Sequence, residues 1–157
     1  MILISACLIG LNCRYDGKSS NEEFLLEKVR NGEALPVCPE QLGGLPTPRV
    51  PAEIVGGTGE DVLSGTAKVC TSDGRDVTSA FLRGARETLY LAKLVKAQYF
   101  IFKQKSPSCG CGQIYDGTFT GTLKCGNGVT TALLLREGLI HLSTCVYQVG
   151  DIFKYLI

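Results

Sequence analysis

The chain has 157 residues, of which 45% are hydrophobic, so it is long enough for one α/β domain with a single core and too short for two. Its 16 basic and 15 acidic residues leave a net charge of +1, which excludes the overall positive field of a general nucleic-acid or membrane binder. We therefore expect one domain over residues 1–157, a small-molecule partner and no large nucleic-acid partner.

The N-terminal segment is an apolar run that ends at a cysteine. Residues 2–6 are continuous and mostly branched, which is typical of a strand covered on both faces. No Lys or Arg precedes the run and no small-residue cleavage site follows it, so a buried strand fits better than a signal peptide. No stretch approaches the roughly 20 apolar residues that span a bilayer. We expect a cytoplasmic protein, in which thiols stay reduced and bind metals or act in catalysis.

A helix and a second strand follow. A capping box at residues 20–23 predicts a helix that closes at Gly32. Residues 34–37 read as a short strand that ends at Cys38. Prolines then carry the backbone away from regular structure, since five of the six in the chain lie here: Pro36, Pro39, Pro46, Pro48 and Pro51.

The middle of the chain changes character twice. Residues 53–77 are rich in Gly, Thr and Asp, with a turn signal at 72–74, and predict an inserted hairpin region. From residue 76 to 96, apolar side chains recur every three or four positions, as in the buried stripe of an amphipathic helix. Residues 99–102 then predict a strand, which opens into a loop that holds Cys109.

The C-terminal third predicts a hairpin at 114–128, a helix at 129–137 and a strand at 139–142, followed by an apolar tail that fits helix and strand equally. Strands that alternate with helices imply a parallel sheet with right-handed crossovers. The predicted fold class is therefore α/β: a small three-layer fold with a mostly parallel, Rossmann-like central sheet plus β-hairpin insertions.

Three cysteines, Cys7, Cys38 and Cys109, each follow a predicted strand. In a parallel sheet the carboxyl ends of the strands share one edge, and ligands bind there. Thiolates are the common ligands of iron–sulfur clusters and structural zinc, and three of them without an obvious fourth leave one metal position open. Because the chain has no closely spaced CxxC pair, the pattern favours an iron–sulfur cluster over zinc.

The other cysteines have weaker claims. Cys13 and Cys111 lie close in sequence to the proposed ligands, so each is an alternative that replaces or supplements one of them. Cys70, Cys125 and Cys145 fit buried structural residues, because reduced cysteine behaves as a small hydrophobic side chain.

Two polar residues are candidates for catalysis. Glu40 follows Cys38 by two positions, where a carboxylate can polarise water or move a proton; a surface carboxylate is the competing interpretation. Ser106 can orient substrate or water, although its spacing favours the capping of a turn. Arg49, Lys103 and Lys105 bring positive charge to the loops, and a solvated loop surface explains them equally well. His141 fits a structural residue.

Eight short motifs are spread over residues 2 to about 140: SACL (5–8), CRYDG (13–17), CPE (38–40), PR (48–49), GRDVT (74–78), SPSCG (106–110), IYDGTF (114–119) and GNGVT (126–130). Together they resemble the motifs of the thiouracil desulfidases, a bacterial family long catalogued as a domain of unknown function. The chain departs from the family in its cysteine-bearing apolar tail after residue 142 and in the additional thiol of Cys111.

The resemblance implies an oxygen-labile [4Fe-4S] cluster on Cys7, Cys38 and Cys109, with a fourth iron free of protein ligand. The implied reaction replaces the sulfur of a thiolated pyrimidine such as thiouracil by oxygen from water, giving uracil and hydrosulfide. It also implies that Glu40 transfers a proton and that Ser106 orients water or substrate. Two alternatives stay open at this point: a non-enzymatic sensing module that binds a metal or cluster, and a sulfur transferase that acts on nucleosides.

Overall fold

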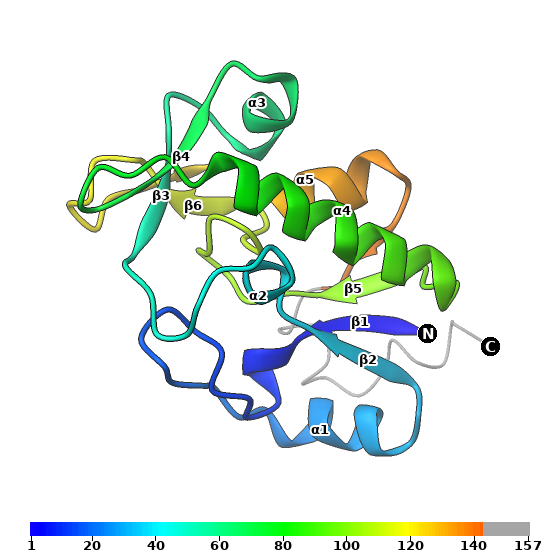
Figure 1. Ribbon diagram of the computed structural model, residues 1–157. Helices are drawn as coiled ribbons and strands as arrows, with labels where there is room; N and C mark the ends of the chain where they lie inside the picture. Colours follow the sequence, from blue (N-terminus) through cyan, green and yellow to red (C-terminus); the bar gives the residue numbers. More distant parts are fainter. Residues whose placement is uncertain (143–157) are drawn as a thin grey trace.

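The computed structural model of the protein describes residues 1–142. A four-stranded parallel sheet lies at its centre (Figure 1). Its strands are β1 (Ile2–Ser5), β2 (Ala34–Val37), β5 (Tyr99–Ile101) and β8 (Ile140–His141). They lie in the order β2-β1-β5-β8, and each pairs with its neighbour in parallel. All four strands were expected from the sequence, and the predicted parallel sheet is confirmed.

The strand order reverses beside β1. The chain passes from β1 to β2 on one side and later returns to β5 on the other, so Ile2 has both Ala34 and Tyr99 as register partners. In open α/β sheets the loops at such a reversal part from one another and leave a crevice beyond the carboxyl ends of the strands. The carboxyl edge around β1 is therefore where a ligand site is expected.

Helices cover both faces of the sheet, which gives three layers (Figure 1). One face is covered by α1 (Glu23–Arg30), and the other by α4 (Thr78–Leu94) and α5 (Val129–Arg136). Each face has its own buried apolar cluster, and β1 alternates its side chains between them. The α1 side contains Ile2, Ile4, Leu25 and Ile101, and the other contains Leu3, Phe100, Phe102, Ala92 and Leu134.

The predicted periodicity of α4 is confirmed, whereas the predicted start of α1 is wrong. No side-chain hydrogen bond caps α1 at Glu22. Instead, Ser20 N donates to Cys7 O over 2.7 Å, and Glu22 N donates to Leu8 O over 2.8 Å. These long-range backbone bonds hold the segment before α1 against the loop that follows β1, and they replace the expected local capping box.

Two antiparallel hairpins flank the main sheet, as predicted. The first pairs β3 (Ala52–Val55) with β4 (Lys68–Thr71), and the second pairs β6 (Gln113–Tyr115) with β7 (Leu123–Cys125). A helix that was not expected from the sequence, α3 (Gly59–Ser64), lies between β3 and β4. Its signal is a capping box, in which Thr58 and Asp61 bond to each other's backbone groups.

A short helix, α2 (Pro39–Leu42), packs directly on α4 through two glycines. A Cβ atom at Gly84 would overlap the carbonyl oxygen of Pro39, and a Cβ atom at Gly43 would overlap that of Ala80. The backbones therefore touch only because both positions lack a side chain. This contact fixes α2, and with it the residues that begin the helix, against the body of the domain.

No helix within residues 1–142 is long and apolar enough to cross a membrane. The tail from residue 145, whose sequence fits helix and strand equally, lies outside the described residues, and so does Cys145.

Candidate metal centre

A cavity of about 640 Å³ opens beyond the carboxyl end of the sheet, where the strand order predicts a ligand site. The predicted cysteines Cys7, Cys38 and Cys109 all line it. Cys7 lies in the 3₁₀ helix η1 (Ala6–Leu8) directly after β1, Cys38 precedes α2 directly after β2, and Cys109 lies in the loop after β5. Parallel topology thus brings together three thiols that are distant in sequence.

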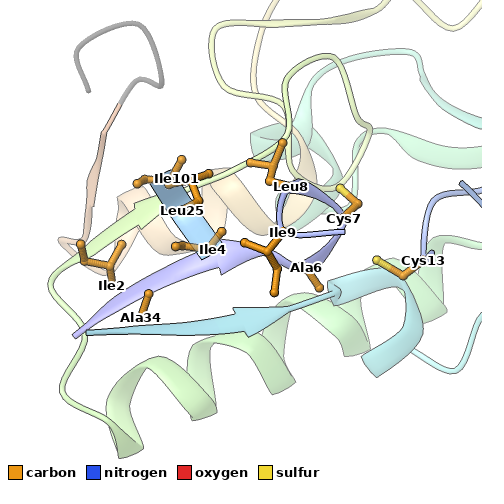
Figure 2. Packing of buried hydrophobic residues seen from close by; sticks show 10 residues of the cluster. All are labelled: Ile2, Ile4, Ala6, Cys7, Leu8, Ile9, Cys13, Leu25, Ala34 and Ile101. Carbon is orange, nitrogen blue, oxygen red and sulfur yellow. The ribbon is translucent and has the colours of Figure 1, made fainter. Parts of the chain in front are cut away.

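A fourth thiol, that of Cys13, joins the other three, whereas Cys111 is not among the residues that line the cavity. Figure 2 shows Cys7 and Cys13 just beyond the carboxyl end of β1, at the end of the apolar cluster on the α1 side. Cys7, Cys13 and Cys109 are buried and Cys38 is half-buried. Of the two alternative ligands named from the sequence, the structure brings only Cys13 to the site.

The thiols contact one another and are hard to ionise. Cys13 hydrogen-bonds to Cys38, which favours its thiolate, but its bond to Cys7 and its burial prevail and raise its pKa to about 11. The bond to Cys13, together with burial, also raises the pKa of Cys38. Burial raises the pKa of Cys109 to about 12. A metal that binds these thiols must therefore displace protons, as is usual for thiolate ligands.

The donor set fits a cluster better than a single ion. Within residues 1–142, no three Cys, His, Asp or Glu side chains converge closely enough to hold one metal ion. Zinc needs four ligands about 2.3 Å or less from one centre. A cubane cluster instead takes each cysteine on a different iron, so its ligands stand farther apart. Thiols that follow three separate strands and line one cavity are the kind of donor set that such a cluster takes.

Glu40 and Ser106, the two predicted catalytic residues, meet at the same cavity. The Ser106 hydroxyl donates to Glu40 Oε1 at 3.4 Å, and Arg49 Nε donates to Glu40 Oε2 at 2.5 Å. The side chains of Arg49 and Glu40 are only 7% and 15% exposed. The structure therefore places Glu40 in a buried ion pair at the cavity wall, and the interpretation of Arg49 as a solvated loop residue is wrong.

Ser106 also caps the turn that carries Cys109, as its spacing predicts. Its hydroxyl accepts from Ser108 N at 3.1 Å and from Cys109 N at 3.0 Å. The N-terminus of α5 holds the same turn, because Thr131 donates its hydroxyl to Cys109 O at 2.8 Å. Ser106 thus links the placement of a thiol to the placement of the Glu40 carboxylate.

Ser108 and the glycines that flank the proposed ligands are not among the residues that line the cavity: Gly10, Gly43, Gly44, Gly110 and Gly112. Ser108 shares a buried hydrogen bond of 2.8 Å with Thr130 instead. Gly43 serves the packing of α2 on α4, as described above. Both residues thus hold elements that carry the site, and neither lines the cavity. Their spacing in the sequence does not reveal this role.

Of the residues that the structure describes, Cys70, Cys111, Cys125 and His141 do not line the cavity. Cys70 and Cys111 are half-buried, and Cys125 is exposed, which contradicts the expectation that it is a buried structural residue. The ring centroid of His141 lies 5.2 Å from that of Phe100, and burial lowers its pKa, in keeping with a structural role.

The fold and the site together define a small α/β protein whose sheet edge carries a thiol-lined cavity with a carboxylate in its wall. A family model described as 2-thiouracil desulfurase matches residues 2–144. The chain belongs to that family, and the resemblance seen in its motifs is confirmed.

Two individual proteins give the similarity its scale. The chain is 53% identical over 138 residues to the Bacillus subtilis protein YbbK, described as uncharacterized, and the match covers 88% of this chain and 91% of that one. The solved structure of the [4Fe-4S]-dependent thiouracil desulfidase TudS superposes with a TM-score of 0.85 at 41% identity, covering 99% of this chain and 98% of that one. The predicted fold class is confirmed by this likeness.

Proposed function

We propose that this protein removes sulfur from a thiolated pyrimidine such as thiouracil, giving uracil and hydrosulfide, with a [4Fe-4S] cluster held by Cys7, Cys38 and Cys109. One observation carries the proposal: three thiols from the segments that follow β1, β2 and β5 line one cavity together with Glu40 and Ser106. The description of the family and the name of the solved neighbour agree with this function, this class of enzyme and this cofactor.

Topology supports these three cysteines as the ligands in preference to Cys13. Each of the three follows a different strand, so they approach the cavity from separate elements. Cys13 instead lies in the loop after η1, and its backbone carbonyl accepts a hydrogen bond from the Cys38 thiol at 3.8 Å. Three ligands leave one iron without a protein ligand; when bound, the cluster supplies a Lewis acid at that iron and an acceptor for the sulfur of the substrate.

The reaction is a hydrolysis without net redox change: the C=S carbon gains oxygen from water, and sulfur leaves as hydrosulfide. Glu40 is the base, because its Oε2 is occupied by Arg49 while its Oε1 faces Ser106 at the cavity wall. Oε1 takes a proton from the water as the water attacks the ring carbon, and it returns a proton to the departing sulfur. Ser106 holds Oε1 in place through the hydroxyl that donates to it, and so sets where that water meets the carboxylate.

The remaining wall of the cavity suits a small flat ring. Apolar side chains contribute to the wall, and they favour a planar heterocycle and limit the access of bulk water. Five that line the cavity are Val37, Pro46, Pro48, Val77 and Phe81. We propose a small thio-compound as the substrate and the cytoplasm, where thiols stay reduced, as the setting.

Anaerobic purification tests this function. We expect a brown protein with about four iron and four sulfide per chain that releases hydrosulfide from 2-thiouracil in step with uracil formation. Cys38→Ser serves as the matched control, because it removes one ligand and leaves the cavity otherwise intact. A wild-type protein that stays colourless and binds no iron after anaerobic reconstitution contradicts the proposal.

A further inference from the structure

Arg49 is the most deeply buried of the arginine side chains that form ion pairs within residues 1–142, and the proposed reaction assigns it no proton transfer and no contact with the substrate. Its side chain is 7% exposed, whereas the paired arginines Arg14, Arg30 and Arg75 are 31% to 63% exposed. Burying a guanidinium costs free energy unless acceptors satisfy its N–H donors. The acceptors around Arg49 therefore explain how its charge is kept out of water.

The guanidinium is held from behind by a set of fixed acceptors. Its Nη1 donates to Cys13 O at 3.1 Å, to Thr47 Oγ1 at 3.2 Å and to Pro46 O at 3.3 Å. The backbone is held as well, because Arg49 N donates to Tyr15 O at 2.8 Å. Two of the three acceptors of Nη1 are backbone carbonyls, so the direction of the side chain is set by the fold.

The remaining face of Arg49 fixes one oxygen of Glu40. Nε donates to Oε2 at 2.5 Å, which leaves Oε1 as the oxygen that meets Ser106. A planar guanidinium restricts the rotation of the carboxylate in a way that the single point charge of a lysine does not. The two carboxylate oxygens therefore have different tasks, one held by Arg49 and one left for chemistry.

We infer that Arg49 is a positioning residue for the desulfidase reaction: it orients the Glu40 carboxylate so that Oε1 faces the cavity, where the water and the substrate would react. This inference rests on the proposed function, because the orientation of Glu40 affects the rate only if Glu40 is the base. It goes beyond that function, because it makes the orientation of Glu40 depend on Arg49, which is itself held by the backbone carbonyls of Cys13 and Pro46.

A double-mutant cycle in the anaerobically prepared holoprotein tests the inference. We expect Arg49→Gln to lower kcat about 10- to 100-fold with little change in KM and with iron per chain unchanged, since a misoriented base affects the chemical step. In a Glu40→Gln background, Arg49→Gln should cause no further loss, because Arg49 acts through the carboxylate. Arg49→Lys should recover part of the rate, and added guanidinium should recover part of the rate of Arg49→Ala.

Arg83→Gln is the matched control. Arg83 also binds the segment around α2 through its guanidinium: its Nε donates to Gly43 O, directly after α2, at 2.9 Å. It supports α2 without contacting Glu40, so its loss should lower the Tm and leave kcat unchanged. An equal loss of kcat in Arg83→Gln would mean that Arg49 acts only by holding α2 in place, and would overturn the inference.

Three further results overturn it: a wild-type kcat in Arg49→Gln, multiplied losses in the double variant, or loss of iron in both Arg49→Gln and Arg49→Lys. If the wild type carries a full cluster yet releases no hydrosulfide, the proposed function fails by itself. In that case the crystal structure of holo Arg49→Gln decides the inference. It stands if the Glu40 carboxylate has turned away from Ser106, and it is overturned if the two remain within hydrogen-bond distance.

Discussion

Two parts of this protein contain the same kinds of side chain in different surroundings. The first, the carboxyl-edge site, consists of Cys7, Cys38, Cys109, Glu40 and Arg49, and the second, the hairpin cluster, consists of Cys111, Cys125, Glu60 and Asn127. Each has cysteines and a glutamate that accepts a hydrogen bond. Only the first lines the cavity, which shows that residue types alone do not mark the candidate site.

The difference lies in burial and in the partner of the glutamate. Glu60 accepts from the neutral amide of Asn127 at 2.7 Å, and that contact is exposed. Cys125 is exposed at the end of β7, and Cys111 is half-buried with a pKa raised by burial. At the carboxyl-edge site a buried cation holds the glutamate, and adjacent parallel strands deliver the thiols. Sheet topology and burial thus separate a candidate reaction centre from a solvated surface with similar composition.

The largest expected effect separates the cysteines of the two parts. Cys38→Ser should abolish hydrosulfide release and lower the iron bound per chain, because a hydroxyl replaces a thiolate ligand. Cys125→Ser should keep wild-type iron and activity, because its thiol is exposed and outside the cavity. Iron and sulfide quantification of both variants, prepared side by side without oxygen, measures this. Full iron and activity in Cys38→Ser would show that Cys13 takes its place as a ligand.

The next effect separates the two glutamates. Glu40→Gln should lower kcat about 10²- to 10⁴-fold, the range that a general base contributes, while the content of the cluster stays at the wild-type level. Glu60→Gln, its counterpart in the hairpin cluster, should leave kcat unchanged. Single-turnover assays with 2-thiouracil, normalised to iron, report both. A Glu40→Gln variant that retains wild-type turnover would remove Glu40 from the proposed mechanism.

The sequence predicts those residues of the carboxyl-edge site whose position depends on a preceding strand. Cys7, Cys38 and Cys109 each follow a buried apolar run, and parallel strands deliver such positions to one edge. Their assignment as ligands stays a prediction, as do the roles of Glu40 and Ser106. For Arg49 the sequence left a solvated loop surface and a charge at the site equally open, because a sequence does not show whether a loop folds back on the helix nine residues before it.

Local signals failed where long-range contacts prevailed. The capping box expected before α1 is absent, because the backbone of that segment bonds to the loop after β1. The segment between β3 and β4 was rich enough in Gly, Thr and Asp to hide α3, although Thr58 and Asp61 form the capping box that marks its start. The approach of Cys13 to Cys7 and Cys38 depends on the path of a loop, which no periodicity encodes.

A smaller effect is expected in the support of the site. Gly84→Ala should lower the free energy of unfolding by about 1 to 3 kcal/mol, because its methyl group would overlap the backbone carbonyl of Pro39. That corresponds to a fall in Tm of roughly 2 to 12 °C. Ser79→Ala, exposed on the same helix, is the control and should leave the Tm nearly unchanged. A wild-type Tm for Gly84→Ala would mean that α2 can move away from α4 without cost.

The smallest effect concerns ion pairs away from the cavity. Lys93 Nζ lies 2.9 Å from Glu137 Oε2 and joins α4 to the end of α5, but the two side chains are 64% and 32% exposed. Water and salt screen such a pair, and holding two long side chains together costs rotamer entropy. Lys93→Ala should therefore change the Tm by no more than the error of the measurement, at low and at high salt alike.

Arg49→Gln, which breaks the buried pair with Glu40, should lower the Tm measurably, because a buried carboxylate remains without its cation. If Lys93→Ala lowered the Tm as much as Arg49→Gln, burial would not be what distinguishes the charges at the carboxyl-edge site from those elsewhere on the protein.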